Sequence, residues 1–380
     1  MAAQVFTNAH IVLQDEVVHG TLHLRDGRIA EVAAGATAVP GAEDLGGDYL
    51  LPGLIDLHTD HFEKHVLPRP GTQWNMLAAV MAHDAQMAAG GVTTTFDCVC
   101  VGVSIKNPER YEIFRPMIDA VREARDKAML RADHIVHLRC EVTDPNVVEL
   151  FDSVADHAAV GMMSLMDHAP GHRQSPDVQR FRARTLKNLR LSEAEADAHI
   201  ERLMNASQTV APQNRRDLAA RAKARGLAIA SHDDETPAHV EEAAAMGITV
   251  SEFPTTLAAA RLAHERNMKI VMGAPNLMRG GSHSGNVSAA ELAAEGLLDN
   301  LASDYVPASL LQAAFRLSEE GHGMTLPQAV ATVSANPAET ARLDDRGRIA
   351  QGLKADLLRV AVVEGRPFVK TVWRDAKRVM

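Results

Sequence analysis

Eight short apolar segments, separated by longer stretches rich in alanine, form the most restrictive pattern of this chain. An apolar run of about four to eight residues bounded by polar turns is typical of a buried strand, and the longer stretches suit amphipathic helices. The apolar segments occupy residues 53–60, 91–100, 133–142, 160–168, 227–235, 247–256, 269–276 and 298–305. Eight strand–helix units predict an α/β fold of the TIM-type (β/α)8 barrel kind.

An open, doubly wound parallel sheet is the alternative fold for the same elements. Almost every apolar segment ends in polar or ionisable residues. In a barrel all the strand ends surround one site, whereas an open sheet concentrates its site at a switch point. The barrel is therefore favoured.

The two ends of the chain have a different pattern from the middle. Residues 1–50 and 343–380 contain short segments with alternating apolar and polar residues, and the Asp26-Gly27 pair is typical of a hairpin turn. We expect these two stretches to pair into one small β-sandwich domain beside a barrel formed by residues 51–342.

The connection after the fourth apolar segment is longer than the others. Residues 172–215 are rich in Arg, Gln, Asn and Glu. We expect this insertion to be helical, and we regard it as a candidate lid.

Composition excludes several classes of function. A formal net charge of −10 makes the chain a poor candidate for nonspecific nucleic-acid binding. The sequence has neither an apolar run long enough to predict a membrane helix nor the basic start of a signal peptide.

Cys98, Cys100 and Cys140 do not make a disulfide framework. We interpret them as reduced residues of a cytoplasmic protein, with Cys98 and Cys100 facing opposite ways on one strand. A homodimer is the default expectation for the oligomeric state.

Ionisable side chains gather at the predicted strand ends. His58 and Asp60 end the first strand, and residues two apart on a strand point to the same face. The other polar strand ends are Asp97, Arg139, Glu141, Asp167, His168, His232, Asp233, Asp234, Glu252, Asn276 and Asp304. Single members have simpler explanations, because Asp97 can cap the next helix and His137 can be a packed core histidine. The set as a whole predicts a metal site.

Imidazole nitrogens and carboxylate oxygens suit zinc, manganese or iron. We expect His58, Asp60, His232 and Asp304 to bind a divalent metal, with Glu141 and His168 as further ligands. Zinc is our first choice, as one ion or two. Two ions that share a water lower its pKa toward neutrality. We expect Glu141 to bridge such a pair, and His232 and Asp304 to be catalytic, with Asp304 as the base.

Several motifs together resemble the amidohydrolase superfamily: LPGLIDLHTD near the start, SHDD at 232, SDY at 303–305 and the closing GRIAQGLKADLL. Longer motifs are similar to one family within it, the diphosphatases of bacterial phosphonate breakdown. These motifs are HTDHFEKHVLPRPG at 58–71, LRCE at 138–141, ASHDDET at 230–236, EFPTT at 252–256, GAPNLMRGGSHSGN at 273–286 and SDYVPASLL at 303–311.

The resemblance covers the whole chain and implies a metal-bearing barrel with a small β-domain made from both termini. It also implies hydrolysis of a small anionic ribosyl triphosphate, α-D-ribose 1-methylphosphonate 5-triphosphate, to pyrophosphate and the 5-phosphate. The alternative within the same fold is an amidohydrolase that acts on a C–N bond. A scaffold protein without activity would have lost the ligands that are present here.

The chain departs from the wider superfamily at three strand ends. Asp60 stands where a second histidine is commoner, Met166-Asp167-His168 where a carboxylated lysine is expected, and Glu252 where a histidine is usual. These departures leave the ligand set and the number of ions open, and they argue against a nucleobase deaminase.

A triphosphate needs local positive charge in a chain that is acidic overall. Lys64, His65 and Arg69 follow the first strand, and Arg139 precedes Glu141. A glycine-rich loop follows the seventh strand and adds Arg279, Gly280, Gly281, Ser282 and His283. Glycines let backbone N–H groups approach phosphate oxygens, and arginine grips them at two points. We therefore expect these residues to bind substrate, although a Gly-Gly-Ser loop can also be a simple surface turn.

Overall fold

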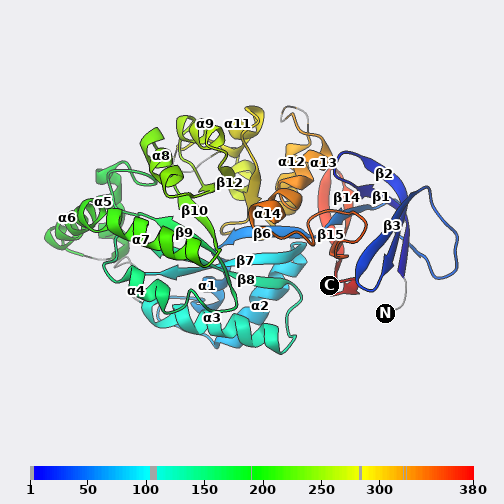
Figure 1. Cartoon of the computed structure of the whole chain (residues 1–380), viewed down its shortest axis with the longest axis horizontal. Helices are drawn as coiled ribbons and strands as arrows, with labels where there is room; N and C mark the ends of the chain where they lie inside the picture. Colours follow the sequence, from blue (N-terminus) through cyan, green and yellow to red (C-terminus); the bar gives the residue numbers. More distant parts are fainter. Residues whose placement is uncertain (1–3, 103–108, 190, 282–284, 320, 322) are drawn as a thin grey trace.

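A parallel barrel forms the larger part of the computed structural model, which describes residues 4–380 except 103–108, 190, 282–284, 320 and 322 (Figure 1). Its eight strands are hydrogen-bonded in chain order from β6 to β13. They are β6 (Leu54–Thr59), β7 (Val92–Val101), β8 (Asp133–Glu141), β9 (Val160–Met166), β10 (Ala228–His232), β11 (Val250–Glu252), β12 (Lys269–Gly273) and β13 (Asn300–Ala302). Each strand lies within one of the predicted apolar segments or one residue beyond it.

The first and last barrel strands meet and exclude the open sheet. Thr59 forms a parallel bridge with Asp304. The backbone N–H of Asp304 donates to His58 O at 2.9 Å, and that of Asp60 donates to Asp304 O at 2.8 Å. The (β/α)8 prediction is confirmed, and His58, Asp60 and Asp304 meet where the barrel closes.

The barrel interior is filled by apolar side chains rather than open. Ile55, Leu57, Phe96, Met162 and Val271 pack together there, each at most 2% exposed. Such a core supports a site at the strand ends instead of a channel. The surrounding helices are α1 (His61–Val66), α2 (Met76–Ala89), α3 (Arg110–Asp126), α4 (Val147–Asp152), α7 (Ala211–Ala224), α8 (Pro237–Ala245), α9 (Leu257–Glu265), α10 (Ala274–Met278), α11 (Ala289–Ala294), α12 (Ser309–Leu317), α13 (Leu326–Ala331) and α14 (Ala335–Thr340).

The predicted insertion is helical. It contains α5 (Val178–Leu189) and α6 (Glu193–Thr209), which lie at the end of the molecule farthest from the terminal strands (Figure 1). Ser192 caps α6 in a reciprocal capping box with Glu195, which explains where that helix begins. At the root of the insertion Arg173 donates to His232 O at 2.9 Å and to Asp234 Oδ1 at 2.8 Å. Its role as a lid stays a prediction.

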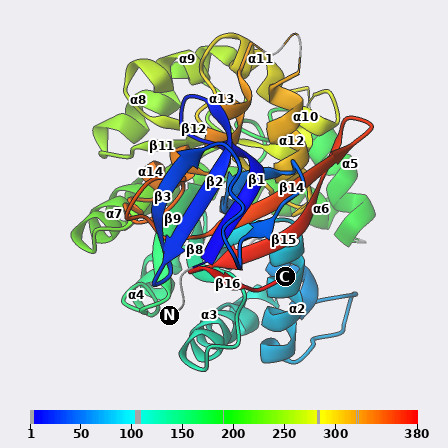
Figure 2. The same ribbon diagram turned by 90° about the vertical axis from the view of Figure 1, so that its right-hand side faces the viewer.

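Strands from both ends of the chain form one mixed sheet (Figure 2). Its order is β16 (Lys377–Arg378), β15 (Arg366–Arg374), β14 (Leu357–Val363), β5 (Tyr49–Pro52), β1 (Gln4–Val12), β2 (Val17–Arg25) and β3 (Arg28–Ala34), with β4 (Glu43–Asp44) paired to β1.

This terminal sheet bends over its own core. The rings of Phe6 on β1 and Trp373 on β15 are 4.7 Å apart. Strands three places apart in a flat sheet are separated by about 14 Å, so the sheet must curl to bring these rings together. The two halves therefore enclose apolar side chains as the faces of a sandwich do. The proposed domain boundaries at 50/51 and 342/343 stay predictions.

A buried carboxyl lies where the sheet of the termini joins the barrel. Asp356 is 5% exposed, and its Oδ1 accepts from the backbone N–H of Asp375 at 2.8 Å. Its Oδ2 is buried, and no described residue forms a hydrogen bond with it. Burial raises the pKa of Asp356 to about 6. The charged form of this group is therefore disfavoured in the folded protein.

Among the helices of the described residues, none combines the length and the apolar character that crossing a bilayer requires.

Candidate metal centre and substrate pocket

Glu252 holds two histidines of the predicted metal site in place. Its Oε1 accepts from His58 Nδ1 at 2.7 Å, and its Oε2 accepts from His232 Nδ1 at 2.8 Å. All three side chains are at most 2% exposed. Burial opposes ionisation of Glu252, but the surrounding His58, His137 and His232 hold its pKa well below the usual range. An ionised carboxylate can only accept, so both histidines carry their protons on Nδ1 and leave Nε2 free to bind a metal.

Two groups of three metal-binding side chains stand next to each other at the strand ends. His58, Asp60 and Asp304 form one group, and the ligand atoms within it lie within 4.8 Å of one another. His168, His232 and Asp233 form the other on the same criterion. The rings of His58 and His232 are stacked with centroids 5.8 Å apart, so the two groups are neighbours.

The donor atoms fit a divalent cation. His58 Nε2 is fully buried and has no hydrogen-bond partner among the described residues, although it lies 3.7 Å from Asp60 Oδ1. A buried polar atom without a partner is costly, and a metal ion would satisfy it. Histidine nitrogen together with carboxylate oxygen is a donor set that zinc, manganese and iron accept. The structure brings five of the predicted ligands together in these two groups: His58, Asp60, His168, His232 and Asp304.

Backbone strain marks the same strand ends. Asp233, Phe253 and Asp304 all have φ between 50° and 60°, a left-handed conformation that costs free energy in residues other than glycine. The Phe253 ring lies against the rings of His58 and His232, with centroids 4.9 and 5.3 Å away. Phe253 thus forms an apolar wall of the metal site.

Arg139 lies between the two groups of ligands. Its Nη1 donates to Asp60 Oδ1 at 2.5 Å, and its Nη2 lies 3.4 Å from His232 Nε2. Burial alone would raise the pKa of Asp60, but Arg139 and His58 hold it well below the usual range. Arg139 also lines the cavity, which accords with its predicted contact with substrate.

Glu141 lies behind His168. Its Oε2 is 2.6 Å from His168 Nδ1, and its Oε1 accepts from the Thr143 hydroxyl at 2.7 Å. Glu141 is 3% exposed, whereas His168 is half-buried. These contacts suit a residue that orients His168, and they differ from the bridging position that the sequence suggested for Glu141.

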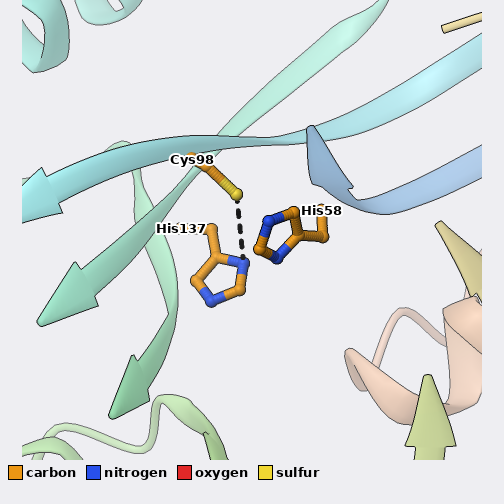
Figure 3. A group of neighbouring side chains, drawn as sticks. All are labelled: His58, Cys98 and His137. Atoms are coloured by element: carbon orange, nitrogen blue, oxygen red, sulfur yellow. Dashed lines mark hydrogen bonds between the residues drawn. The ribbon is translucent and has the colours of Figure 1, made fainter. Parts of the chain in front are cut away.

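Cys98 and His137 lie next to His58 (Figure 3). Cys98 Sγ is 3.8 Å from His137 Nδ1, and that nitrogen is 3.0 Å from Leu57 O. Burial raises the pKa of Cys98 to about 12 and lowers that of His137 to about 4, so both are neutral near pH 7. A neutral thiol is a poor metal ligand. The pair packs against His58, and His137 is a buried core histidine.

The expectation that Cys98 and Cys100 face opposite ways was wrong. Residues two apart on a strand share a face, and the electrostatic surroundings of both thiols include Arg139 and Asp60.

Three other acidic strand-end residues have partners outside the metal site. Asp97 accepts from His83 and His134, which contradicts its interpretation as a helix cap. Asp167 is paired with Arg215, and Asp234 with Arg173. Position at a strand end therefore did not by itself identify a ligand.

A cavity opens above the metal ligands. Its lining includes His58, Asp60, Arg139, Gln174, His232, Asp233, Phe253, Asn276, Arg279, Gly281, Asn286, Asp304 and Tyr305. Arg279 Nη1 is 3.3 Å from the Tyr305 hydroxyl, so the loop after β12 reaches the mouth of the cavity. Gln174 brings the insertion to the same cavity.

The predicted substrate residues fall into different places. Lys64 Nζ donates to Tyr305 O at 3.3 Å, which puts it beside the cavity lining. Gly280 adjoins that lining in the chain. Within the described part of the chain, the lining includes neither His65 nor Arg69, which contact Gln86 and Thr72 instead. Ser282 and His283 lie outside the described residues.

Sequence reasoning left out several functional residues. Glu252 stood among the strand ends, but its contact with both histidines joins side chains 194 and 20 positions apart in the chain. Asp233 and Phe253 gave a weaker signal, since each follows a strand-end residue directly. Tyr305 had no signal beyond its place in the SDY motif.

The family model described as the amidohydrolase family matches residues 85–371. The chain belongs to the amidohydrolase family. Members of this superfamily usually use a divalent metal, and the His/Asp groups of this amidohydrolase fit one.

Relatives agree along the full length. Alpha-D-ribose 1-methylphosphonate 5-triphosphate diphosphatase from Escherichia coli (strain K12) is 42% identical over 376 residues, which are 99% of this chain and 100% of the relative. A 5-methylcytosine deaminase from Klebsiella pneumoniae matches the fold with a TM-score of 0.64 at 16% identity, over 99% of this chain and 98% of the other. A dihydropyrimidinase from Brevibacillus agri matches with a TM-score of 0.63 at 14% identity, over 99% and 95%. At such low identity, the matches to the last two proteins show only that this amidohydrolase shares their fold.

Proposed function

We propose that this amidohydrolase hydrolyses a phosphoanhydride of α-D-ribose 1-methylphosphonate 5-triphosphate and releases pyrophosphate and the 5-phosphate. The observation that carries the proposal is the 42% identity to the E. coli diphosphatase of that name, which extends over 99% of this chain. The resemblance in the strand-end motifs points to the same substrate.

The proposed metal ligands are His58, Asp60 and Asp304 for one ion and His168, His232 and Asp233 for a second. Two adjacent groups of donors favour two ions over one. Zinc is the metal we favour, with manganese or iron as alternatives in a site this rich in carboxylates. When bound, divalent metals make water more acidic and polarise phosphoryl oxygens. In this assignment Glu141 and Glu252 orient the histidine ligands rather than bind an ion.

Asp304 is the proposed general base. It lines the cavity together with His58 and Asp60, so a water above these residues is within reach of its carboxylate. As the water oxygen attacks the α-phosphorus, Asp304 takes a proton from that water. The P–O bond between the α- and β-phosphoryl groups breaks, and pyrophosphate leaves with the bonding electron pair.

Positive charge around the cavity meets the charge of the triphosphate. Arg279 and Arg139 line it, and Lys64 lies beside Tyr305 at its edge. Arg139 shares its charge with Asp60, whereas Arg279 contacts the neutral Tyr305 hydroxyl. We therefore assign the leaving pyrophosphate to the side of Arg279, where charge that develops in the transition state is neutralised.

The test measures pyrophosphate release and metal content together, for wild type and His232→Asn. His264→Gln is the matched control, because His264 is exposed on α9. We expect pyrophosphate from wild type and from the control, and loss of turnover and of the metal at the substrate-side ligands in His232→Asn. Absence of turnover by metal-loaded wild type would reject the diphosphatase assignment and favour hydrolysis of a C–N bond. A cytoplasmic location and a homodimer stay predictions.

A further inference from the structure

A second group of histidines lies on the helices next to β6. His61 and His65 are on α1, and His83 is on α2. Residues four apart on a helix share a face, so α1 presents both of its histidines in one direction. One ligand nitrogen from each of the three residues lies within 4.8 Å of the others. Nothing in the proposed phosphoanhydride chemistry uses this group.

The barrel wall separates this group from the substrate cavity. His83 contacts Asp97 on β7, and the next residue, Cys98, faces His58 inside the barrel. Adjacent residues on a strand point to opposite faces. The three histidines therefore lie on the helical side of β7, and the cavity lies on the other side. None of the three lines that cavity in the described part of the chain.

The ring positions match those of histidines around one ion. The centroids of His61 and His65 are 5.0 Å apart, those of His65 and His83 are 5.9 Å apart, and those of His61 and His83 are 6.2 Å apart. Histidine rings bound through nitrogen to a tetrahedral zinc have centroids roughly 5 Å apart, given a Zn–N distance of about 2.0 Å. Movements of about 1 Å, mainly of half-buried side chains on the short helix α1, would complete the geometry.

Asp97 prepares His83 as a ligand. The His83 ring is 0% exposed, and its Nε2 lies 2.8 Å from Asp97 Oδ1. A carboxylate accepts, so Nε2 carries the proton and the lone pair of His83 lies on Nδ1. That Nδ1 is fully buried and, in the part of the chain that the structure describes, has no hydrogen-bond partner, and the same is true of His61 Nδ1. A histidine held by a carboxylate from behind is the usual outer-shell arrangement at zinc sites.

We propose that His61, His65 and His83 form a second metal site, which takes zinc or a similar borderline divalent ion. Three neutral imidazoles favour such ions over magnesium, calcium or manganese. His61 and His65 are partly exposed, which leaves a fourth position for water. The ion ties α1 to α2 and so fixes the segment that directly follows Asp60.

Metal stoichiometry tests the site independently of turnover. The full-length protein is purified, equilibrated with excess zinc, desalted and analysed for bound metal, in wild type and in His61→Gln/His65→Gln. The same pair is compared in a His232→Asn background, where the substrate-side site is impaired. His264→Gln is the control for loss of an exposed histidine.

We expect the double variant to hold one molar equivalent of zinc less than wild type in both backgrounds, with His264→Gln unchanged. Cobalt serves as a second probe, because its visible absorption reports a tetrahedral site that the double variant lacks. Equal zinc in a folded double variant and in wild type would overturn the proposal.

Zinc-edge anomalous scattering from wild-type crystals grown with zinc decides the question even if the variant does not fold. A peak among the three rings supports the site. Absence of that peak in crystals whose substrate-side metal site is fully occupied by zinc refutes it. Failure of this site leaves the diphosphatase assignment untouched, because that assignment is judged by pyrophosphate release.

Discussion

Replacing Glu252 with glutamine tests how the metal ligands are oriented. The carboxylate accepts from His58 Nδ1 at 2.7 Å and from His232 Nδ1 at 2.8 Å. In Glu252→Gln one of these oxygens becomes an NH2 group, which donates. One histidine must then accept at Nδ1 and carry its proton on Nε2, the atom that is meant to bind the metal. Volume and burial stay almost the same, so the change acts on proton positions.

The structure sets the size of the effect. One of the two histidines loses its carboxylate partner, and loss of one such partner typically weakens metal binding about 10- to 100-fold. That range corresponds to about 1.4 to 2.7 kcal/mol in the free energy of metal binding. Because no ligand is removed, turnover at saturating metal should recover most of the wild-type value.

The assay is metal-dependent pyrophosphate release, with metal titrated from a buffered pool into the stripped enzyme. Glu265→Gln is the matched control, since Glu265 is exposed at the end of α9. We expect the activation midpoint of Glu252→Gln to move at least tenfold to higher metal, with no shift in Glu265→Gln. An unchanged midpoint in Glu252→Gln would refute the reasoning, because both histidines would then bind metal without a carboxylate behind them.

Three further predictions follow from other residues. Asp304→Asn should lower kcat at least 100-fold, because general-base catalysis typically contributes about 100-fold or more. The same change should flatten the rise of kcat with pH, and single-turnover kinetics at saturating metal would show both effects. Arg279→Met should lower kcat for the triphosphate about tenfold or more, because the charge that Arg279 neutralises develops in the transition state, with a smaller change in KM. The pKa of Asp356 is raised to about 6 in the fold, so its contribution to stability is present below pH 4 and is lost as pH rises toward 6 and above. Asp356→Asn should therefore raise the free energy of unfolding at pH 7.5 by up to about 3 kcal/mol, and denaturant unfolding at pH 4 and 7.5 would show whether the gain is confined to the higher pH.

The sequence predicted the barrel well because the signal was repeated. Eight apolar segments each supplied the same information, and an error in one would not have changed the fold class. His58, Asp60, His232 and Asp304 were placed together for a related reason. Strand direction alone brings the ends of parallel strands to one face.

Contacts between side chains were harder to predict. Glu141 was expected to be a ligand because it ends a strand, but its carboxylate lies against His168 Nδ1, and Glu252, which was not among the expected ligands, lies against His58 Nδ1. His65 was assigned to substrate, yet α1 turns it toward α2 and His83. Which way a side chain turns after a strand end depends on neighbours that are distant in the chain, and one sequence does not contain that information.

The central claim is that the enzyme breaks the phosphoanhydride between the α- and β-phosphoryl groups. The most direct test follows α-D-ribose 1-methylphosphonate 5-triphosphate by ³¹P NMR with metal-loaded wild-type enzyme. The account predicts that the triphosphate resonances give way to one pyrophosphate signal and one 5-phosphate signal, while the phosphonate signal persists. Orthophosphate as the first product, loss of the phosphonate signal, or an unchanged spectrum would contradict it.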